Sequence, residues 1–215
     1  MKDNTSELVC FTIGHSTHNI EQFIELLKRH AIQWVVDIRS TPYSRYNPQF
    51  NRDLFKTDIE NNDISYLFMG DSLGARYDDN NLCFADKPVV DFRKIRDLES
   101  FKEGINRITK GVKQGRKIAL MCSEKDPLGC HRFVLVSYAL VKGGITIKHI
   151  LENGETILNA ELEEKLIAKY KLENKQMHLF ENPLTKKDAI EEGYVRRNRE
   201  VGFSQEDTPY TEEQL

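Results

Sequence analysis

The stretch "LVCFTIGHSTHNIEQFIELLKRHAIQWVVDIR" (8–39) contains two continuously apolar runs separated by an amphipathic one. Residues 8–15 and 33–39 each predict a buried strand. Residues 19–30 place apolar side chains at helical spacing, and Asn19 and Gln22 are positioned like a capping box at the start of this helix. A strand, a helix and a strand in this order predict the beginning of an α/β fold.

The same alternation continues along the chain. Further strands are expected at 64–70, 117–122 and 146–151, and helices at 51–61, between 89 and 111, at 130–141 and over roughly 159–172. Because strands that are apolar throughout are covered on both faces, we expect a mainly parallel sheet of about five strands with helices on both faces. This α/β domain should span residues 1–173. Since periodicity weakens from about residue 174, residues 174–215 are expected to form a C-terminal helical or irregular appendage, partly mobile.

The composition fits one soluble domain with an appendage, because the 215 residues are 39% hydrophobic and 30% charged. A formal charge of −3 argues against a globally basic nucleic-acid binder, while a local basic site stays open. No apolar run has the length of a membrane span, and the first residues lack the pattern of a signal peptide. Four cysteines are too few for a disulfide scaffold. We expect a cytoplasmic protein with reduced thiols and no membrane partner; the sequence does not indicate its oligomeric state.

Polar and reactive side chains follow four of the five expected strands. They include His15 and Ser16 after the first strand, Asp37 and Arg39 after the second, Asp71 and Arg76 after the third, and Cys122, Cys130, His131 and Arg132 after the fourth. The carboxyl ends of parallel strands form the edge at which open α/β sheets bind ligands. We therefore expect His15, Asp37, Arg39, Cys122 and Arg132 to converge on one cleft.

The motif "MCSEKDPLGCHR" (121–132) is the densest group of reactive side chains. Residues 126–129 match a type I turn, although Asp126 also fits the cap of a helix that begins at Pro127. We favour the turn, with the helix starting near Cys130 and its free N–H groups forming an anion site beside Arg132 and Lys125. Arg132→Ala should then weaken anion binding by roughly tenfold or more, whereas Arg197→Ala in the tail should do little.

The two cysteines of this motif allow three interpretations. A thiol at a helix start beside an arginine has a lowered pKa and can act as a nucleophile. Alternatively, Cys122 and Cys130 are small core residues. As a third reading, they could bind zinc together with His131. The seven-residue gap between the cysteines is not zinc-finger spacing, so we favour a site without metal and the cofactor stays unknown.

Two further groups carry open alternatives. His15 can act as an acid or base, or it can be a buried histidine with satisfied hydrogen bonds. Asp37 and Arg39 also fit a structural ion pair. The segment 41–52 interleaves aromatic rings with polar side chains, among them Tyr43, Arg45 and Asn47. This pattern suits a nucleobase or single-stranded nucleic acid, and it equally suits a surface loop held by its aromatic residues.

The runs "TIGHST" (12–17), "VVDIRSTPYSRYNPQFN" (35–51) and "MCSEKDPLGCHR" (121–132), with "LG" (73–74) and "HIL" (149–151), resemble the "domain of unknown function 488" family. The resemblance covers roughly residues 8–151. It implies that the motif residues of the family are His15, Asp37, Arg39, Cys122, Glu124, Lys125, Asp126, Cys130, His131 and Arg132. It supports the position of the site and implies no particular reaction.

We interpret the chain as an intracellular hydrolase or group transferase that acts on an anionic substrate such as a nucleotide or a nucleic-acid derivative. The expected catalytic residues are His15, Asp37, Cys122, Cys130 and His131. The expected substrate-binding residues are Ser16, Arg39, Tyr43, Arg45, Asn47, Lys125 and Arg132. Redox chemistry is less favoured, because neither a dinucleotide fingerprint nor a Walker loop is present. The alternative is a non-catalytic module that binds nucleic acid or a small ligand.

Overall fold

A computed structural model describes residues 7–173 and 185–204, and it contains a six-stranded sheet in the order β3-β2-β6-β1-β7-β8. The strands are β1 (Val9–Gly14), β2 (Trp34–Asp37), β3 (Ser65–Phe68), β6 (Ile118–Cys122), β7 (Thr146–Ile150) and β8 (Thr156–Leu158). Five are parallel, and β8 pairs antiparallel with β7 at the edge. The predicted α/β class and mainly parallel sheet are confirmed. Strand β8 and a small antiparallel sheet of β4 (Cys83–Phe84) and β5 (Lys87–Val90) are additions.

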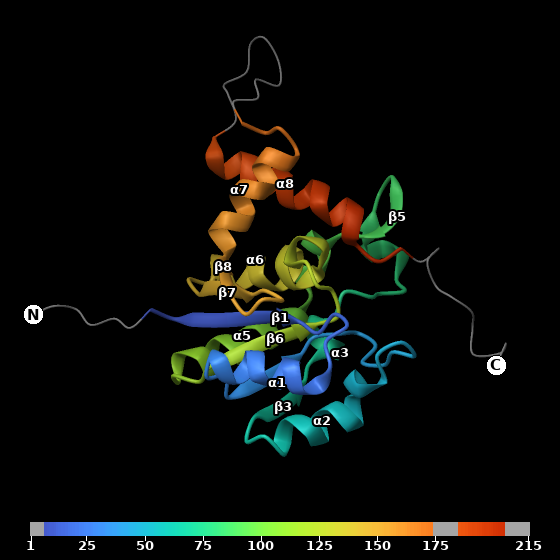
Figure 1. Cartoon of the computed structure of the whole chain (residues 1–215). Helices are drawn as coiled ribbons and strands as arrows, with labels where there is room; N and C mark the ends of the chain where they lie inside the picture. Colours follow the sequence, from blue (N-terminus) through green and yellow to red (C-terminus); the bar gives the residue numbers. More distant parts are fainter. Residues whose placement is uncertain (1–6, 174–184, 205–215) are drawn as a thin grey trace, which may run out of the picture.

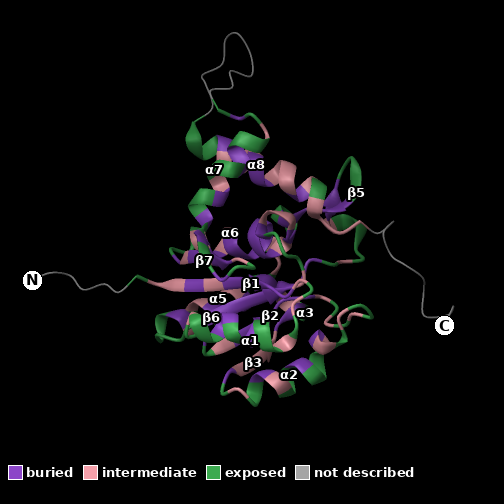
Figure 2. Ribbon diagram, in the orientation of Figure 1, coloured by how far each residue is buried: buried purple, intermediate pink, exposed green. Residues whose placement is uncertain are grey.

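Helices cover both faces of the large sheet (Figure 1). On one face lie α1 (Ile20–Arg29) and α2 (Arg52–Glu60), with Phe23 and Phe55 buried against the sheet. The opposite face is covered by α3 (Gly70–Leu73), α4 (Phe92–Asp97), α5 (Glu99–Lys113) and α6 (Tyr138–Lys142). The expected cap of α1 is present, because Asn19 Oδ1 accepts the N–H of Gln22 at 2.8 Å. Figure 2 shows that burial is concentrated in the strands and in the helix faces turned toward them.

The connection between β6 and the following helix is a compact turn. Residues Pro127–Gly129 form a short 3-10 helix, η3, and the side chain of Asp126 accepts the N–H of Leu128 at 2.9 Å. The Gly129 N–H donates to the Asp126 carbonyl at 3.1 Å, so the turn and the Asp126 cap coexist. Cys130 is extended, and the helix begins after it, first as the π-helical stretch η4 (Arg132–Ser137) and then as α6. The helix thus starts near Cys130, as expected, and the Cys130 carbonyl accepts the N–H groups of Phe133 and Val134.

The C-terminal segment returns to the α/β domain. Helix α7 (Asn159–Lys169) packs against α8 (Lys186–Val201), and the far end of α8 reaches β5 (Figure 1). The Asn198 side chain accepts the Phe92 N–H at 2.7 Å and donates to the Val90 carbonyl at 2.9 Å. Residues 185–204 thus form a helix and a short extension held by buried contacts. The remainder of the expected appendage, at 174–184 and 205–215, lies outside the described residues.

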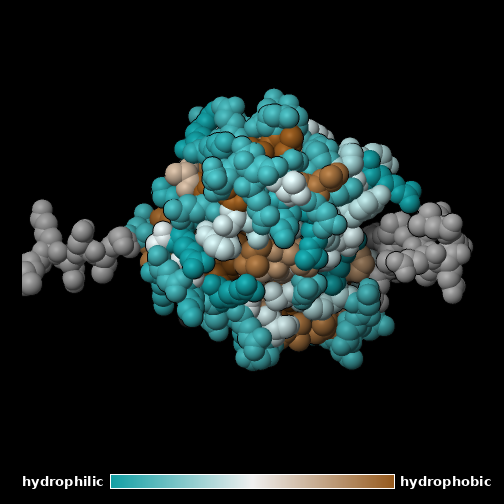
Figure 3. Space-filling view, turned by 90° about the horizontal axis from the view of Figure 1, so that it is seen from below, coloured by the Kyte–Doolittle hydropathy of each residue, from teal (hydrophilic) through white to brown (hydrophobic). Residues whose placement is uncertain are grey.

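The surface seen from below in Figure 3 is mostly hydrophilic, and its hydrophobic atoms gather in small areas. Within the two described ranges, no helix has the length and apolarity that a membrane span requires.

Candidate functional site

A pocket of about 370 Å³ lies beyond the carboxyl ends of β2 and β6. This edge of the sheet is on the right in Figure 1, near β5 and the end of α8. Its walls are formed by residues 39–41, 75–76, 122–124, 129–131 and 200–203. The pocket is therefore built from three connections of the α/β domain, those after β2, α3 and β6, and from the C-terminal segment.

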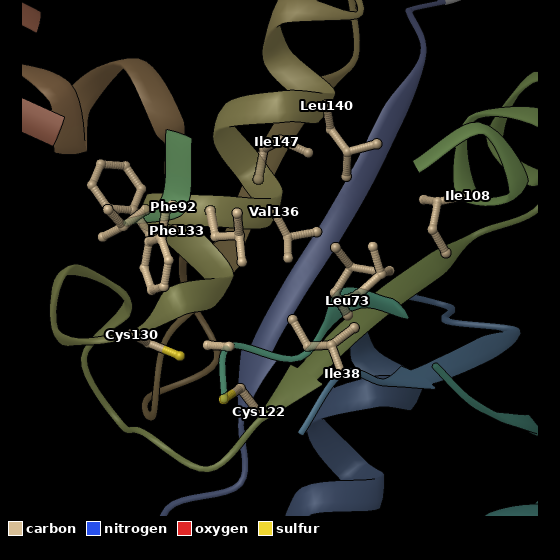
Figure 4. Close-up of a cluster of buried hydrophobic side chains, with 14 of the residues drawn as sticks. Ile38, Leu73, Phe92, Ile108, Cys122, Cys130, Phe133, Val136, Leu140 and Ile147 are labelled. Carbon is tan, nitrogen blue, oxygen red and sulfur yellow. The ribbon is translucent and has the colours of Figure 1, made fainter. Parts of the chain in front are cut away.

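Cys122, Cys130 and His131 form the inner wall of the pocket. Cys122 ends β6 and Cys130 precedes η4, and both sit at one end of the larger hydrophobic core (Figure 4). Nε2 of His131 lies 3.0 Å from the Ile38 carbonyl, which can only accept, so Nε2 carries the proton. Nδ1 is then free to face the sulfur atoms, at 3.5 Å from Cys122 Sγ and 3.9 Å from Cys130 Sγ.

The two thiols differ in their acidity. The hydrogen bond with Cys130 and then burial raise the pKa of Cys122 well above its ordinary value. Burial alone would raise the pKa of Cys130 as well. The hydrogen bond from Cys122, the positive charge of Arg132 and the adjacent His131 ring outweigh that effect and lower the pKa of Cys130 well below its ordinary value. Cys130 is therefore the more acidic thiol of the pair, and all four cysteines of the chain are free.

Arg39, Asp37 and His15 form a buried network behind this wall. Arg39 donates to both carboxylate oxygens of Asp37, at 2.9 and 2.6 Å, and to the Phe50 carbonyl at 2.9 Å. His15 Nδ1 donates to the Ser16 carbonyl at 2.9 Å, so His15 Nε2 accepts from Arg39 at 3.2 Å. Burial, followed by the charge of Arg39, lowers the pKa of His15 to about 4. At neutral pH His15 is uncharged with both ring nitrogens bonded, which matches the buried-histidine alternative.

Arg132 does not contact the pocket. Its side chain is 0% exposed and donates to the carbonyls of Glu124 and Lys125, so it organises the 124–130 loop from inside. The expectation that Arg132 binds an anion directly does not fit this geometry. The residue turns inward because the carbonyls of Glu124 and Lys125 accept its guanidinium N–H groups there.

The expected side chains converge at one edge of the sheet, but only some of them line the pocket. His15, Asp37, Arg39, Cys122 and Arg132 all lie at one edge of the sheet, but only Arg39 and Cys122 line the pocket. Ser16 contributes its backbone N–H to the Ser123 carbonyl at 2.9 Å. Lys125 is exposed and pairs with Glu152.

The aromatic segment after β2 lies outside the pocket walls. Tyr43, Arg45 and Asn47 do not line the pocket, and the side chains of Tyr43 and Tyr46 are 63% and 95% exposed. Phe50 alone is buried and stacks on His15 with a centroid distance of 4.2 Å. This arrangement has features of both sequence alternatives, an exposed aromatic surface and a loop held by one buried ring.

Three contributors to the pocket were not among the expected catalytic or substrate-binding residues. Arg76 is exposed at the wall, and its guanidinium lies 5.3 Å from the Phe203 ring centroid. Glu124 lines the same pocket, and loss of solvation followed by the charge of Cys130 raises its carboxyl pKa. Both follow expected strands: the sequence singled out Arg76 by this position and Glu124 as a motif residue, but neither was given a role. Residues 200–203 carried no such signal, because only the packing of α8 brings them here.

The fold and the site define an α/β protein with a thiol and imidazole cluster at the carboxyl edge of a parallel sheet. The family model described as "Domain of unknown function DUF488" matches residues 19–139, more than half of the 215 residues. The chain belongs to this family. Neither the curated proteins nor the solved structures gave a match.

Proposed function

We propose that the protein is a hydrolase or group transferase that acts on an anionic substrate in this pocket. The observation that carries the proposal is the presence of two thiols, the free Nδ1 of His131 and the Glu124 carboxyl around one cavity, with an exposed arginine at its wall. Such reactions require a nucleophile, a group that acts as acid or base, and a cation that binds the anionic substrate. A volume of about 370 Å³ suits a small molecule such as a nucleotide or a phosphorylated metabolite.

The anion is held by Arg76 in this proposal. Arg76 makes no ion pair within the described ranges, whereas the charge of Arg39 is already matched by Asp37. Glu124 is placed to transfer a proton between the substrate and solvent, because its side chain reaches the pocket from the loop after β6. The free thiols fit a reducing compartment, so we assign the protein to the cytoplasm as part of the same proposal.

The test is turnover by the full-length protein of a panel of p-nitrophenyl phosphate, p-nitrophenyl sulfate, nucleoside 5′-phosphates and nucleoside diphosphates. Glu124→Gln should lower kcat by about 100-fold or more, as loss of a proton-transfer group does. Arg76→Ala should raise KM by roughly tenfold with a smaller change in kcat, because it removes a charge-assisted contact.

The matched control is Arg116→Ala. This exposed arginine lies over Trp34 at 5.0 Å, before β6 and therefore at the opposite edge of the sheet. The Arg116→Ala substitution removes one positive charge, as Arg76→Ala does, and should leave KM and kcat unchanged. Absence of turnover across the panel, or equal KM for Arg76→Ala and the parent protein, would overturn the proposal.

The second candidate, a non-catalytic nucleic-acid or ligand-binding module, is favoured by the exposure of Tyr43 and Tyr46. Exposed rings beside Arg45 can stack on unpaired bases. If this candidate is correct, Tyr46→Ala should weaken binding of a fluorescent single-stranded oligonucleotide by about fivefold or more, while Tyr170→Phe, in the helical C-terminal region, leaves it unchanged. Equal affinities of Tyr46→Ala and the parent protein would exclude this surface.

A further inference from the structure

The three donor atoms on the inner wall of the pocket are close enough to share one ion. The Sγ atoms of Cys122 and Cys130 and a ring nitrogen of His131 all lie within 4.8 Å of one another. In the part of the chain that the structure describes, this is the one group of three or more such side chains whose donors converge. The cysteines are separated by seven residues in the sequence, but the turn at Pro127–Gly129 folds the chain back between them.

The distances fit tetrahedral coordination. With Zn–S of about 2.3 Å and Zn–N of about 2.0–2.1 Å, a tetrahedral centre separates sulfur from nitrogen by about 3.6 Å. The observed separations from His131 Nδ1 are 3.5 Å to Cys122 and 3.9 Å to Cys130. Both sulfur–nitrogen separations therefore match coordination to one ion to within a few tenths of an ångström.

The surroundings orient the donors in the way that metal sites require. The bond from His131 Nε2 to the Ile38 carbonyl, at 3.0 Å, keeps the proton on Nε2 and leaves the lone pair of Nδ1 directed at the sulfurs. The backbone N–H of Arg132 donates to Cys130 Sγ at 3.4 Å and stabilises negative charge there. His131 and Cys130 are thus each fixed by a partner outside the coordination sphere.

We propose that Cys122, Cys130 and His131 bind one Zn²⁺ ion whose fourth position opens into the pocket. The proposal rests on the pocket assigned under the proposed function and names the cofactor of that site. Two thiolates and one neutral imidazole balance the charge of the ion, and the two thiol protons are released to solvent on binding. Sulfur ligands select zinc over magnesium and calcium.

Three protein ligands with an open fourth position are the pattern of catalytic zinc sites. The open position receives a water or a substrate oxygen, and Arg76 and Glu124 lie on the walls of the same pocket. The reaction class then becomes metal-assisted hydrolysis or transfer, with the thiols acting as ligands.

The test uses full-length protein, reduced and stripped with a chelator, and titrated first with Co²⁺ and then with Zn²⁺. One Co²⁺ per chain should give thiolate-to-cobalt charge transfer in the near ultraviolet and the visible bands of tetrahedral cobalt, and Zn²⁺ should abolish both. Cys122→Ser, Cys130→Ser and His131→Gln should each weaken binding by about 100-fold or more. Cys83→Ser, which removes a buried thiol far from the site in sequence and outside the cluster, should bind as the parent does.

A measurement on the unaltered chain covers the case in which a variant fails to fold. Zn²⁺ should protect Cys122 and Cys130 from iodoacetamide, as mapped by mass spectrometry, and should leave the labelling of Cys83 unchanged. Absence of stoichiometric binding, a spectrum without thiolate bands, or unchanged labelling of Cys122 and Cys130 would overturn the zinc site. Stoichiometric zinc with no turnover on the substrate panel would overturn the proposed function alone, and full turnover by the metal-free protein would overturn only the zinc site.

Discussion

Arg197 in α8 donates a hydrogen bond from Nε to the carbonyl of Leu128 at 2.6 Å. This contact joins residues 69 positions apart and fixes the turn that carries Cys130 from the side of the C-terminal helix. The Arg197 side chain is only 16% exposed, and it also pairs with Glu200. The sequence-based expectation that Arg197 is a neutral control therefore conflicts with its position.

Arg197→Ala should lower the free energy of unfolding by about 1 kcal/mol, because it removes a charge-assisted bond to a partly buried turn. It should also weaken Co²⁺ binding, since the turn positions Cys130. Arg196→Ala is the control, because Arg196 pairs with Glu192 one helical turn away at the surface, a pair that should contribute a few tenths of a kcal/mol. Urea unfolding of both variants checks the difference, and equal stabilities would show that the Leu128 contact is unimportant.

Arg132→Ala should destabilise the protein by roughly 3 kcal/mol, because two loop carbonyls lose a buried charged donor. Arg132→Lys should recover only part of this, since a lysine cannot reach both carbonyls with a planar fork. Chemical denaturation gives the two values. If Arg132→Ala keeps the parent stability and loses anion binding instead, the direct-binding expectation from the sequence is correct after all.

Gly14→Ala should disturb the loop after β6. A Cβ on Gly14 would lie 1.8 Å from the Glu124 carbonyl oxygen, a backbone atom that cannot move without shifting the loop. We expect a loss of about 1–3 kcal/mol, as for other overpacked sites. Gly129→Ala is the matched control in the same region, because its nearest neighbour would be Arg197 at 3.7 Å, an ordinary contact. A melting temperature unchanged by Gly14→Ala would contradict this packing.

The stability of the fold should decrease as the pH falls below about 6.5. Burial lowers the pKa of His149 to about 3, while the unfolded chain takes up the proton near the ordinary value of 6.5. Between these pH values the unfolded state binds more protons, so acid favours unfolding. The cost for His149 is about 2 kcal/mol at pH 5, and His15, with its pKa near 4, adds a similar amount.

Urea unfolding at pH 7 and pH 5 measures this dependence. His149→Asn should be less stable at pH 7, because His149 bonds to Thr12 at 2.8 Å and to Asn159 at 3.2 Å, but it should lose less stability between the two pH values. An identical loss in the variant and the parent protein would exclude His149 as a source of the pH dependence.

Much of the fold follows from local pattern. The run 8–39 forms β1, α1 and β2 as predicted, and strands 117–122 and 146–151 appear as β6 and β7. These elements are predictable because continuous apolar runs must be buried and because backbone hydrogen bonding within a helix is local. Strand β8 was missed: its three residues alternate in exposure at a sheet edge, which leaves little signal in the sequence.

The position of the site also follows from the sequence, whereas the roles of its residues do not. Polar side chains after strands gather at one edge because parallel strands present their carboxyl ends together. Whether each side chain faces the cavity depends on contacts with distant residues. Asp37 turns away from the pocket toward Arg39 and Tyr66, and His15 stacks on Phe50.

The sequence by itself determined that this chain forms a parallel α/β sheet and that its reactive groups collect beyond β6, since both depend on the order of apolar and polar residues. Only the tertiary structure decided which groups share the pocket. It turned Arg132 inward, brought Arg76 and residues 200–203 to the wall, and placed Cys122 and Cys130 side by side despite a seven-residue gap. The physical reason is that side-chain direction in a connection is set by long-range packing and hydrogen bonds, which neighbouring residues in the sequence do not encode.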